Sequence, residues 1–375
     1  MRRLRVALII ATLDQAGAEK QVSLLARRMD PARFDVRVIA LTRGGPYEAE
    51  LRQAGIPVTV LGKAFKYDLR VVLQLRQILR DEKIDVAYTW MFTANAFGRA
   101  AARWAGTPIL VAGEMDTGHK PALHHLIDRR MAAWTDVIVA NSEGVREYGR
   151  RHGWPEDKVR VIHNGIDLAE ISGEPQLEAP LPDVPPGYTV ALTTCRLTRQ
   201  KGLLYLIWAM ALLDFAKADV HLWIAGDGPE RGRLEEEAGR LLGTASRVKF
   251  LGRRNDVPAL LRRADLFVLP SLHEGLSNSV LEAMLAGKPV VVSNVAGMSE
   301  LVDGGRCGFL VEPGYPKSIA AGIYQLMVHP DRRERMAREG QARIRELFSA
   351  ERFVKTHEDL FAELAERKGI ANIES

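Results

Sequence analysis

Two cations lie at a spacing that suits the binding of a phosphorylated ligand. Arg196 and Lys201 belong to the segment CRLTRQKG (residues 195–202), which follows the apolar run Val190–Thr194 and precedes a helical pattern. At the carboxyl end of a strand and the start of a helix, backbone N–H groups and the helix dipole already favour an anion. Two cations added there could bind a diphosphate and stabilise the charge that develops on it as a leaving group. A single pair of this kind also occurs on ordinary surface loops.

Two carboxylates occupy a similar position later in the chain. The segment HEGLSNSVLE (residues 273–282) follows a predicted strand over Leu266–Leu269 and runs into a predicted helix over Ser279–Ala286. Carboxylates accept hydrogen bonds from vicinal sugar hydroxyls, so we expect Glu282 to bind a ribose and Glu274 a sugar. Each is equally compatible with a carboxylate that caps or faces a helix. We assign the intervening residues to substrate binding, with the last two also typical of helix N-caps: Gly275, Leu276, Ser277 and Asn278.

Two glycine turns also follow predicted strands. Gly226 opens the sequence GDGP after the run Val220–Ala225, and Gly17 precedes the first predicted helix. A glycine at either place would allow backbone to approach a ligand closely, although both also fit simple strand-to-helix turns. Neither turn has the G-x-G-x-x-G pattern of a dinucleotide site, which argues against a dehydrogenase.

Apolar β-branched runs alternate with amphipathic segments through both halves of the chain, which predicts an α/β fold with parallel sheets covered on both faces. The residues 168–187 are rich in proline and glycine and have no periodicity, so they predict a linker. We therefore expect a Rossmann-like domain over 1–168, a linker over 169–187, a second such domain over 188–347, and a C-terminal helix over 348–375 that packs back on the first domain. Ligands of such sheets bind at the carboxyl ends of the strands, here in a cleft between the domains.

Besides the three runs already named, short apolar runs predict strands in both halves of the chain. These are Leu4–Ile10, Phe34–Leu41, Pro57–Leu61, Val86–Trp90, Pro108–Val111, Val137–Ala140, Val248–Leu251 and Val290–Val292.

Composition narrows the class of protein. The chain has 375 residues, of which 47% are hydrophobic and 26% charged, so it can bury a core in each half. The net charge is +5, and the basic excess lies in residues 1–170, which hold 26 Lys+Arg against 20 Asp+Glu. No cluster is dense enough for a nucleic-acid arm, so we predict no nucleic-acid partner. The basic half instead fits a solvated surface, or a phosphorylated or membrane-anchored acceptor.

The two cysteines and the first residues bear on location. Cys195 and Cys307 are far apart in the sequence, as expected of packing residues in a reducing compartment. The apolar run Val6–Leu13 follows three arginines and precedes Ala-Gly-Ala at 16–18, which resembles a signal-peptidase site; a buried first strand explains the same residues, and we favour it. No run of about 18 apolar residues occurs, so we expect a cytoplasmic protein, free or peripheral on the membrane.

Taken together, these motifs resemble the family 4 glycosyltransferases of the two-Rossmann GT-B fold. The resemblance rests on Arg196-x4-Lys201-Gly202, Gly226-Asp227-Gly228-Pro229, Glu274-x7-Glu282, Asn164-Gly165-Ile166-Asp167 and Gly17-Ala18-Glu19, and it covers essentially the whole chain. It implies retaining transfer from a nucleotide-diphosphate sugar without a metal or other cofactor. By the same resemblance, the Arg196–Lys201 pair and Gly17 lie at the diphosphate, Glu282 at the ribose and Glu274 at the sugar. No D-x-D occurs; Glu114-x-Asp116 is interpreted as loop.

One departure concerns the first domain. Family members often carry a histidine just after the strand that corresponds to Pro108–Val111, where it meets the donor sugar. Here Glu114 and Asp116 occupy the nearer positions of the expected loop 112–120, and His119 lies further along. We retain His119 as a candidate catalytic residue, with a surface role as the alternative. His124 and His125 lie in a helical pattern and are weaker candidates.

Three functions remain open from the sequence. The leading hypothesis is a retaining hexosyltransferase that uses a UDP-sugar, or else a GDP-sugar, and a glycan or lipid-linked acceptor in surface polysaccharide or glycolipid synthesis. The second is a nucleotide-sugar epimerase or a phosphorylase on the same fold. The third is a non-catalytic nucleotide-binding partner of a polysaccharide-assembly complex.

Overall fold

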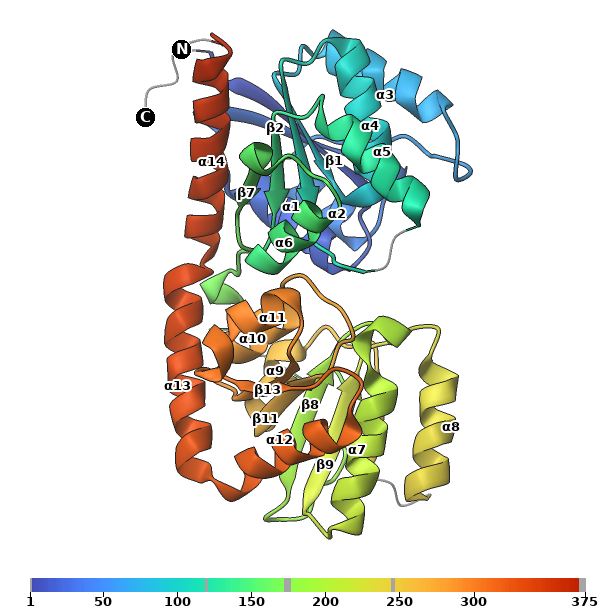
Figure 1. Cartoon of the computed structure of the whole chain (residues 1–375), viewed down its shortest axis with the longest axis vertical. Helices are drawn as coiled ribbons and strands as arrows, with labels where there is room; N and C mark the ends of the chain where they lie inside the picture. The colour runs from blue at the N-terminus through green and yellow to red at the C-terminus, as the bar shows by residue number, and fades with distance from the viewer. Residues whose placement is uncertain (1, 119–120, 172–176, 244–246, 371–375) are drawn as a thin grey trace. The chain divides into compact units, whose positions relative to one another are not determined.

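The chain forms two compact units, seen in a computed structural model that describes residues 2–118, 121–171, 177–243 and 247–370 (Figure 1). One unit comprises residues 1–165 together with 350–375, and the other comprises residues 166–349. His119 lies outside the described residues, as do Pro175 and the rest of 172–176 in the predicted linker. The described linker residues 177–187 form neither helix nor strand.

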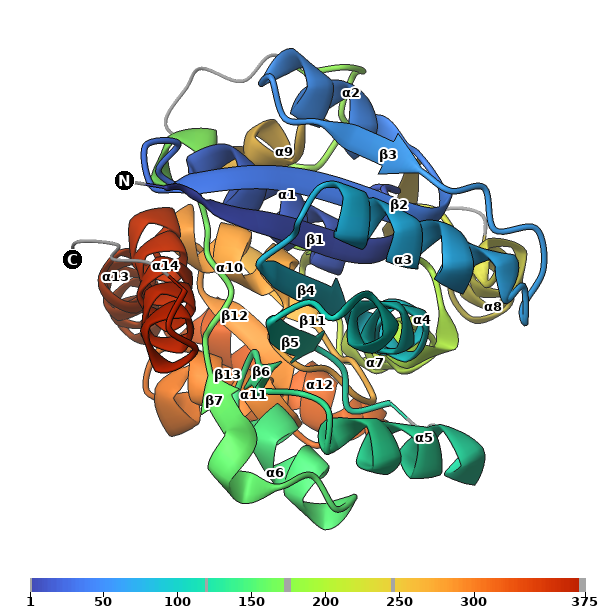
Figure 2. The same cartoon turned by 90° about the horizontal axis from the view of Figure 1, so that it is seen from above.

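The first unit is built on a seven-stranded sheet with the order β3-β2-β1-β4-β5-β6-β7, in which every recorded pairing is parallel. Figure 2 shows α3 and α4 on one side of this sheet and α14 on the other. The elements of the unit are β1 (Leu4–Thr12), α1 (Gly17–Arg28), β2 (Phe34–Arg43), α2 (Pro46–Gln53), β3 (Val58–Val60), α3 (Arg70–Asp81), β4 (Val86–Trp90), α4 (Met91–Ala105), β5 (Ile109–Glu114), α5 (Ala122–Ala132), β6 (Val137–Ala140), α6 (Glu143–Arg151), the 3-10 helix η1 (Glu156–Lys158), β7 (Val159–Val161) and α14 (Ala350–Arg367).

The first strand lies in the middle of this sheet. Val6 and Leu8 pack in the core on the side of α1 and α14, while Ala7 and Ile9 pack on the side of α3 and α4. Because both faces are covered, the strand is apolar at nearly every position rather than at alternate ones. The run at Val6–Leu13 is therefore a buried strand, as the favoured interpretation predicted.

The helix α14 belongs to the first unit although it comes from the end of the sequence. Its Phe361 and Leu364 are buried in the same core cluster as Phe34 of β2. His357 is completely buried; its Nε2 and the hydroxyl of Tyr88 are 3.2 Å apart, and its Nδ1 is 2.8 Å from the Phe353 carbonyl oxygen. Burial lowers the pKa of His357 to about 4, so the ring is neutral at neutral pH.

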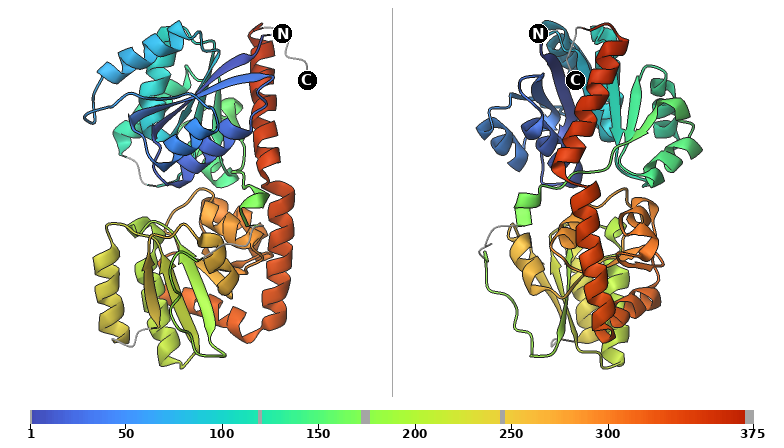
Figure 3. Two further views of the ribbon diagram at one scale, coloured as in Figure 1. Left: turned by 180° about the vertical axis from the view of Figure 1, so that it is seen from behind. Right: turned by 90° about the vertical axis from the view of Figure 1, so that its left-hand side faces the viewer.

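The second unit has a six-stranded sheet with the order β10-β9-β8-β11-β12-β13, again with parallel pairings. Side chains of α7, α8 and α12 belong to the core cluster on one face, and those of α9, α10 and α11 to the cluster on the other, while α13 contributes Met336 to the first and Ile344 to the second. Figure 3 shows the ribbons of helices on both sides of this sheet. The elements are η2 (Leu168–Ile171), β8 (Thr189–Thr194), η3 (Arg199–Lys201), α7 (Leu203–Phe215), β9 (Val220–Ala225), α8 (Arg231–Leu242), β10 (Val248–Gly252), α9 (Val257–Arg263), β11 (Leu266–Leu269), α10 (Asn278–Leu285), β12 (Val290–Ser293), α11 (Ala296–Leu301), η4 (Asp303–Gly305), β13 (Phe309–Val311), α12 (Pro316–Val328) and α13 (Pro330–Leu347).

Two parallel sheets with helices on both faces confirm the predicted fold class. In each unit the order of strands reverses beside the first strand: β1 lies between β2 and β4, and β8 lies between β9 and β11. Ligands of doubly wound sheets bind outside the carboxyl ends of the strands at this reversal. The prediction missed the edge strands β7 and β13; each has only three residues, and a charged residue interrupts β7 at Arg160 and follows β13 at Glu312.

Candidate functional site

The second unit brings two of the predicted residues into direct contact. Lys201 follows β8, Glu274 follows β11, and their side chains form an ion pair, with 17% and 10% of the respective side chains exposed. The hydroxyl of Ser271 donates to Glu274 Oε1 over 3.0 Å. Because β8 and β11 are neighbours at the strand reversal, the pair lies where this fold binds ligands.

The two loops that carry the pair are joined through their backbones. Leu272 N–H donates to the Gln200 carbonyl oxygen over 2.7 Å, and Gln200 Nε2 donates to the His273 carbonyl oxygen over 3.0 Å. Gly202, in the left-handed region at φ +66°, passes so close that a Cβ there would lie 2.0 Å from the Pro270 carbonyl oxygen. Glycine after Lys201 is thus required for the contact between the loops. Gln200 and Ser271 were missed, since polar residues in loops carry no distinguishing sequence signal.

Arg196 stands apart from this ion pair. Its side chain is exposed and forms no hydrogen bond or ion pair with any residue that the structure describes. The next residue, Leu197, donates its N–H to the Asp227 carbonyl oxygen over 2.9 Å, which ties the loop to the turn after β9. The backbone beside Arg196 is therefore fixed, while its guanidinium remains accessible at the carboxyl edge of the sheet, as binding of a diphosphate would need.

The turn at Gly226 serves the packing of these loops. Gly226 has φ +143°, and a Cβ on it would lie 1.9 Å from the Cys195 carbonyl oxygen. A side chain at Gly228 would likewise meet the Leu197 carbonyl oxygen at 2.4 Å. Both glycines are needed because the chain passes against the loop of Arg196; their proximity to a donor stays a prediction. Cys195 itself has a pKa raised to about 11, chiefly by burial, in keeping with a packing role.

Helix α10 presents the second carboxylate. It begins at Asn278, one residue earlier than predicted, and Glu282 lies half-buried on its second turn. Ser277 is at the N-cap position in extended conformation, but its side chain makes no capping bond and its Oγ is instead 3.1 Å from the Ser279 Oγ. The expected side-chain cap is therefore wrong. Gly275, Leu276 and Ser277 are buried residues of the loop that precedes α10. Their role in substrate binding, that of Asn278, and the ribose role of Glu282 stay predictions.

In the first unit, Gly17 is the exposed first residue of α1, as predicted for a helix start after β1. The 12-residue helix has no side-chain cap at its N-cap residue, Ala16. Thr12 Oγ1, at the end of β1, donates to Glu19 Oε1 over 2.9 Å and fixes the turn between them. The role of the Gly17 N–H toward phosphate stays a prediction.

The expected loop from Ala112 is wrong over its first three residues. Strand β5 continues through Glu114, which is buried with only 1% of the residue exposed. The predicted strand ended at Val111, because a glycine and a carboxylate interrupt the apolar pattern that follows. Burial first, and then the charges of Glu114 and Asp116, raise the pKa of Tyr148 to about 12. Tyr148 donates its hydroxyl to the Gly118 carbonyl oxygen over 3.3 Å, so the first described part of this loop is held against α6.

A buried ion pair that the sequence analysis missed lies behind Glu114. Arg99 of α4 pairs with Asp128 of α5, with 3% and 6% of their side chains exposed, and Arg99 Nε donates to the Asn95 carbonyl oxygen over 2.8 Å. Asn95 Nδ2 in turn donates to the Gly113 carbonyl oxygen over 3.0 Å. Burial lowers the pKa of Arg99 while Asp128 and Glu114 oppose that shift. This network fixes α4 and α5 against the carboxyl end of β5.

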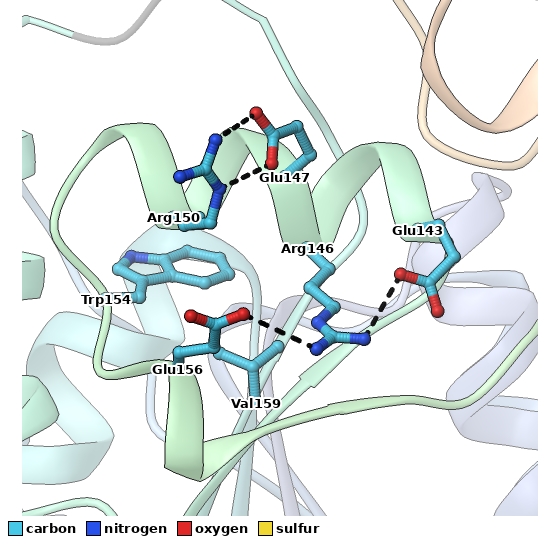
Figure 4. Close-up of a pocket in the computed structure, with 7 residues that line it drawn as sticks. All are labelled: Glu143, Arg146, Glu147, Arg150, Trp154, Glu156 and Val159. Atoms are coloured by element: carbon cyan, nitrogen blue, oxygen red, sulfur yellow. Dashed lines mark hydrogen bonds and ion pairs between the residues drawn. The ribbon is translucent and has the colours of Figure 1, made fainter.

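A surface hollow of about 180 Å³ lies elsewhere in the first unit, between α6 and β7 (Figure 4). Arg146 there pairs with Glu143 at 3.4 Å and with Glu156 at 3.7 Å, and Arg150 pairs with Glu147 at 2.7 Å. None of the predicted site residues that the structure describes lines this hollow. Its charges are satisfied by one another, so we assign it no part in the site.

Two features are absent from the described residues. No helix among them is long and apolar enough to cross a membrane. No group of three or more His, Cys, Asp or Glu side chains among them is arranged to hold a metal ion. Metal independence stays a prediction.

Comparison with known proteins places the chain in a family. Residues 16–170 match the family described as Glycosyltransferase Family 4, and residues 188–329 match Glycosyl transferases group 1, which together span most of the chain. The lipopolysaccharide core biosynthesis glycosyltransferase LpsE of Rhizobium meliloti is 32% identical over 61% of this chain, and the match covers 64% of LpsE, less than two thirds of its length. The UDP-Gal:alpha-D-GlcNAc-diphosphoundecaprenol alpha-1,3-galactosyltransferase of Escherichia coli is 27% identical over 74% of this chain and 76% of its own.

A solved structure agrees with the sequence matches. Anabaena HepE in complex with UDP and glucose is 25% identical, has a TM-score of 0.82, and covers 96% of this chain and 99% of its own. Both halves of the chain thus match glycosyltransferase families, and both units have the parallel sheets of the GT-B fold. The chain belongs to the family 4 glycosyltransferases of the GT-B fold.

Proposed function

We propose that the protein is a retaining, metal-independent hexosyltransferase that uses a nucleotide-diphosphate sugar and a glycan or lipid-linked acceptor. A UDP-sugar is favoured over a GDP-sugar, because the E. coli relative is named for UDP-Gal and the HepE structure contains UDP and glucose. The acceptor class follows the E. coli relative, named for a diphosphoundecaprenol acceptor, and LpsE, named for lipopolysaccharide core biosynthesis. The pathway would be surface polysaccharide or glycolipid synthesis.

The contact between Lys201 and Glu274 at the strand reversal carries this proposal. A diphosphate that reaches Lys201 would meet an ammonium that Glu274 has already oriented, with Arg196 accessible from the same connection between β8 and α7. Fixed charges of this kind stabilise the leaving group without having to reorganise during the reaction. Glu274 would then contribute twice, by orienting Lys201 and by accepting a hydrogen bond from the donor sugar.

The proposed reaction breaks the bond between the anomeric carbon and the diphosphate oxygen, whose electron pair stays on the diphosphate. The acceptor hydroxyl attacks the anomeric carbon from the same face and forms the new glycosidic bond. Its proton passes to a phosphate oxygen of the departing nucleoside diphosphate. Arg196 and Lys201 would supply the positive charge that a divalent cation supplies in other transferases.

Substitution of Arg196 by Ala tests the site. We expect turnover with a UDP-sugar and an acceptor to fall by roughly 10²- to 10³-fold, the usual effect of removing one fixed electrostatic donor. Arg233→Ala is the matched control, because Arg233 is an exposed arginine of α8 that pairs with Glu230. Both variants should unfold like the wild type, since neither guanidinium is buried. Equal turnover in the wild type and Arg196→Ala would refute the assignment.

The chemistry needs separate measurements. NMR of the product should show the anomeric configuration of the donor, and an inverted product would exclude the retaining mechanism. Turnover should persist in EDTA. Incubation with UDP-sugars and no acceptor should give at most slow hydrolysis of the donor. Conversion of the donor sugar into another sugar would instead indicate an epimerase. Binding of UDP without turnover on any acceptor would indicate a non-catalytic protein. Calorimetry with UDP and GDP identifies the base.

A further inference from the structure

The connection between β3 and α3, continued by the first turns of α3, is an exposed surface of mixed basic and apolar character. Residues 61–80 contain five Lys and Arg but a single acidic residue, Asp68. Four large apolar side chains in this stretch are exposed: Phe65 59%, Tyr67 67%, Leu69 70% and Leu73 59%. Figures 1 and 3 draw the connection as an arm that projects from the rim of the first unit. We call residues 63–73 the basic-aromatic arm.

The cations of the arm lie beside its aromatic rings. Lys66 Nζ is 5.3 Å from the ring centroid of Tyr67, and Lys63 Nζ is 5.1 Å from that of Phe97 on α4. Neither lysine pairs with a carboxylate in the part of the chain that the structure describes. Their charge is therefore available to an anionic partner, while their carbon stems lie along apolar surface.

The one carboxylate in the arm shapes it and adds no exposed negative charge. Asp68 is buried, accepts hydrogen bonds from Arg70 Nε at 2.8 Å and Arg70 Nη2 at 3.0 Å, and accepts another from the Ala64 N–H at 3.2 Å. These bonds close the turn and hold Phe65 and Tyr67 outward.

Two exposed leucines lie at the start of α3, away from the side that packs on the sheet. Val72, Leu75 and Leu79 pack into the core against the sheet. Leu69, the N-cap residue, and Leu73 lie one turn apart on the exposed side, within the arm. Trp104, 59% exposed, adjoins this side, because Arg76 Nε donates to the Trp104 carbonyl oxygen over 3.1 Å. Together with Phe65 and Tyr67, these leucines form a run of exposed apolar side chains, which is typical of an interaction surface.

We infer that the basic-aromatic arm docks the protein on the surface of an anionic lipid bilayer. Aromatic rings and leucines partition into the boundary between headgroups and acyl chains, and neighbouring lysines bind anionic headgroups. Single-stranded nucleic acid would use the rings as stacking surfaces but would leave Leu69 and Leu73 without a role. The arm holds three cations, Lys63, Lys66 and Arg70, against one buried acid, Asp68, and this excess favours an anionic surface over a neutral one.

Vesicle flotation tests this inference. The whole protein, without donor or acceptor, should float with vesicles of phosphatidylcholine and phosphatidylglycerol, and only weakly with phosphatidylcholine alone. Substitution of Lys63 and Lys66 by Gln should lower the partition coefficient roughly 30-fold, since each basic residue near the surface contributes about five-fold. Phe65→Ser/Leu69→Ser should also lower it, and 0.5 M salt should weaken the wild type.

Phe215→Ser is the matched control, because Phe215 is 89% exposed at the end of α7 but belongs to the second unit. It should bind vesicles like the wild type, and all variants should keep the wild-type melting temperature. The inference is overturned if the wild type does not float, if the arm variants bind as the wild type does, or if Phe215→Ser loses binding equally. Turnover on a soluble acceptor, measured separately, should be unchanged in the arm variants, so the docking surface and the proposed transfer can fail independently.

Discussion

The ion pair between Lys201 and Glu274 gives a prediction that separates a structural role from a catalytic one. Lys201→Met would remove the ammonium that pairs with the Glu274 carboxylate, whose side chain is 10% exposed. Breaking a fully buried pair in this way costs about 3–5 kcal/mol, and the residual exposure of both side chains lets water compensate in part. We therefore expect a loss of about 2 kcal/mol of unfolding free energy, within the range of about 1.5–3 kcal/mol for a hydrogen bond to a charged group.

A second substitution should restore stability without restoring catalysis. Glu274→Gln removes the negative charge of the side chain and keeps its shape. The unfolding free energy of the double variant Lys201→Met/Glu274→Gln should therefore be at least about 1 kcal/mol higher than that of Lys201→Met. Its turnover should stay roughly 10²- to 10³-fold below the wild type, because the diphosphate still lacks its cation.

Urea unfolding followed by circular dichroism, with turnover measured on the same preparations, provides the test. Lys355→Met is the matched control: Lys355 pairs with Asp359 at 3.4 Å on the exposed face of α14, where such a pair contributes under about 0.5 kcal/mol. The reasoning about the pair is refuted if the double variant is as unstable as Lys201→Met. The assignment of Lys201 to the diphosphate is refuted if Lys201→Met turns over normally.

Two further predictions concern the scaffold. Gly226→Ala should destabilise the protein by more than about 2 kcal/mol, because φ is +143° and the new Cβ would meet the Cys195 carbonyl oxygen. The control Gly232→Ala in α8, where a Cβ would have nothing within 4 Å, should stabilise the protein by up to about 1 kcal/mol. Equal shifts of the two melting temperatures would contradict this prediction. His357 has a folded pKa of about 4 against an ordinary 6.5, so the unfolded chain binds its proton first and stability falls as pH drops from about 6.5 to 4. The loss at pH 5 should be about 2 kcal/mol and should vanish in His357→Gln, as urea unfolding at pH 8 and pH 5 would show.

The sequence determined the elements that carry the site. Strands over 190–194 and 266–269 could be predicted almost to the residue, because runs buried on both faces are apolar throughout and end where polar loops begin. Arg196, Lys201 and Glu274 could then be placed at carboxyl ends of parallel strands, which lie on one edge of a sheet. Local residue types were sufficient for this step.

Contacts between distant segments were decided only by the tertiary structure. Lys201 and Glu274 are 73 residues apart, and their loops meet because β8 pairs with β11 at the strand reversal, a strand order that no local pattern records. Sequence reasoning gave them different parts of the donor and did not foresee their ion pair. At Glu114 the prediction from local residue types was wrong. A carboxylate predicts an exposed loop, yet the fold buries Glu114 at the end of β5, near the buried ion pair of Arg99 and Asp128. The cations and aromatic residues of the basic-aromatic arm are evident in the sequence. Their exposure, however, depends on which side of α3 packs on the sheet, and this is decided only when the core forms.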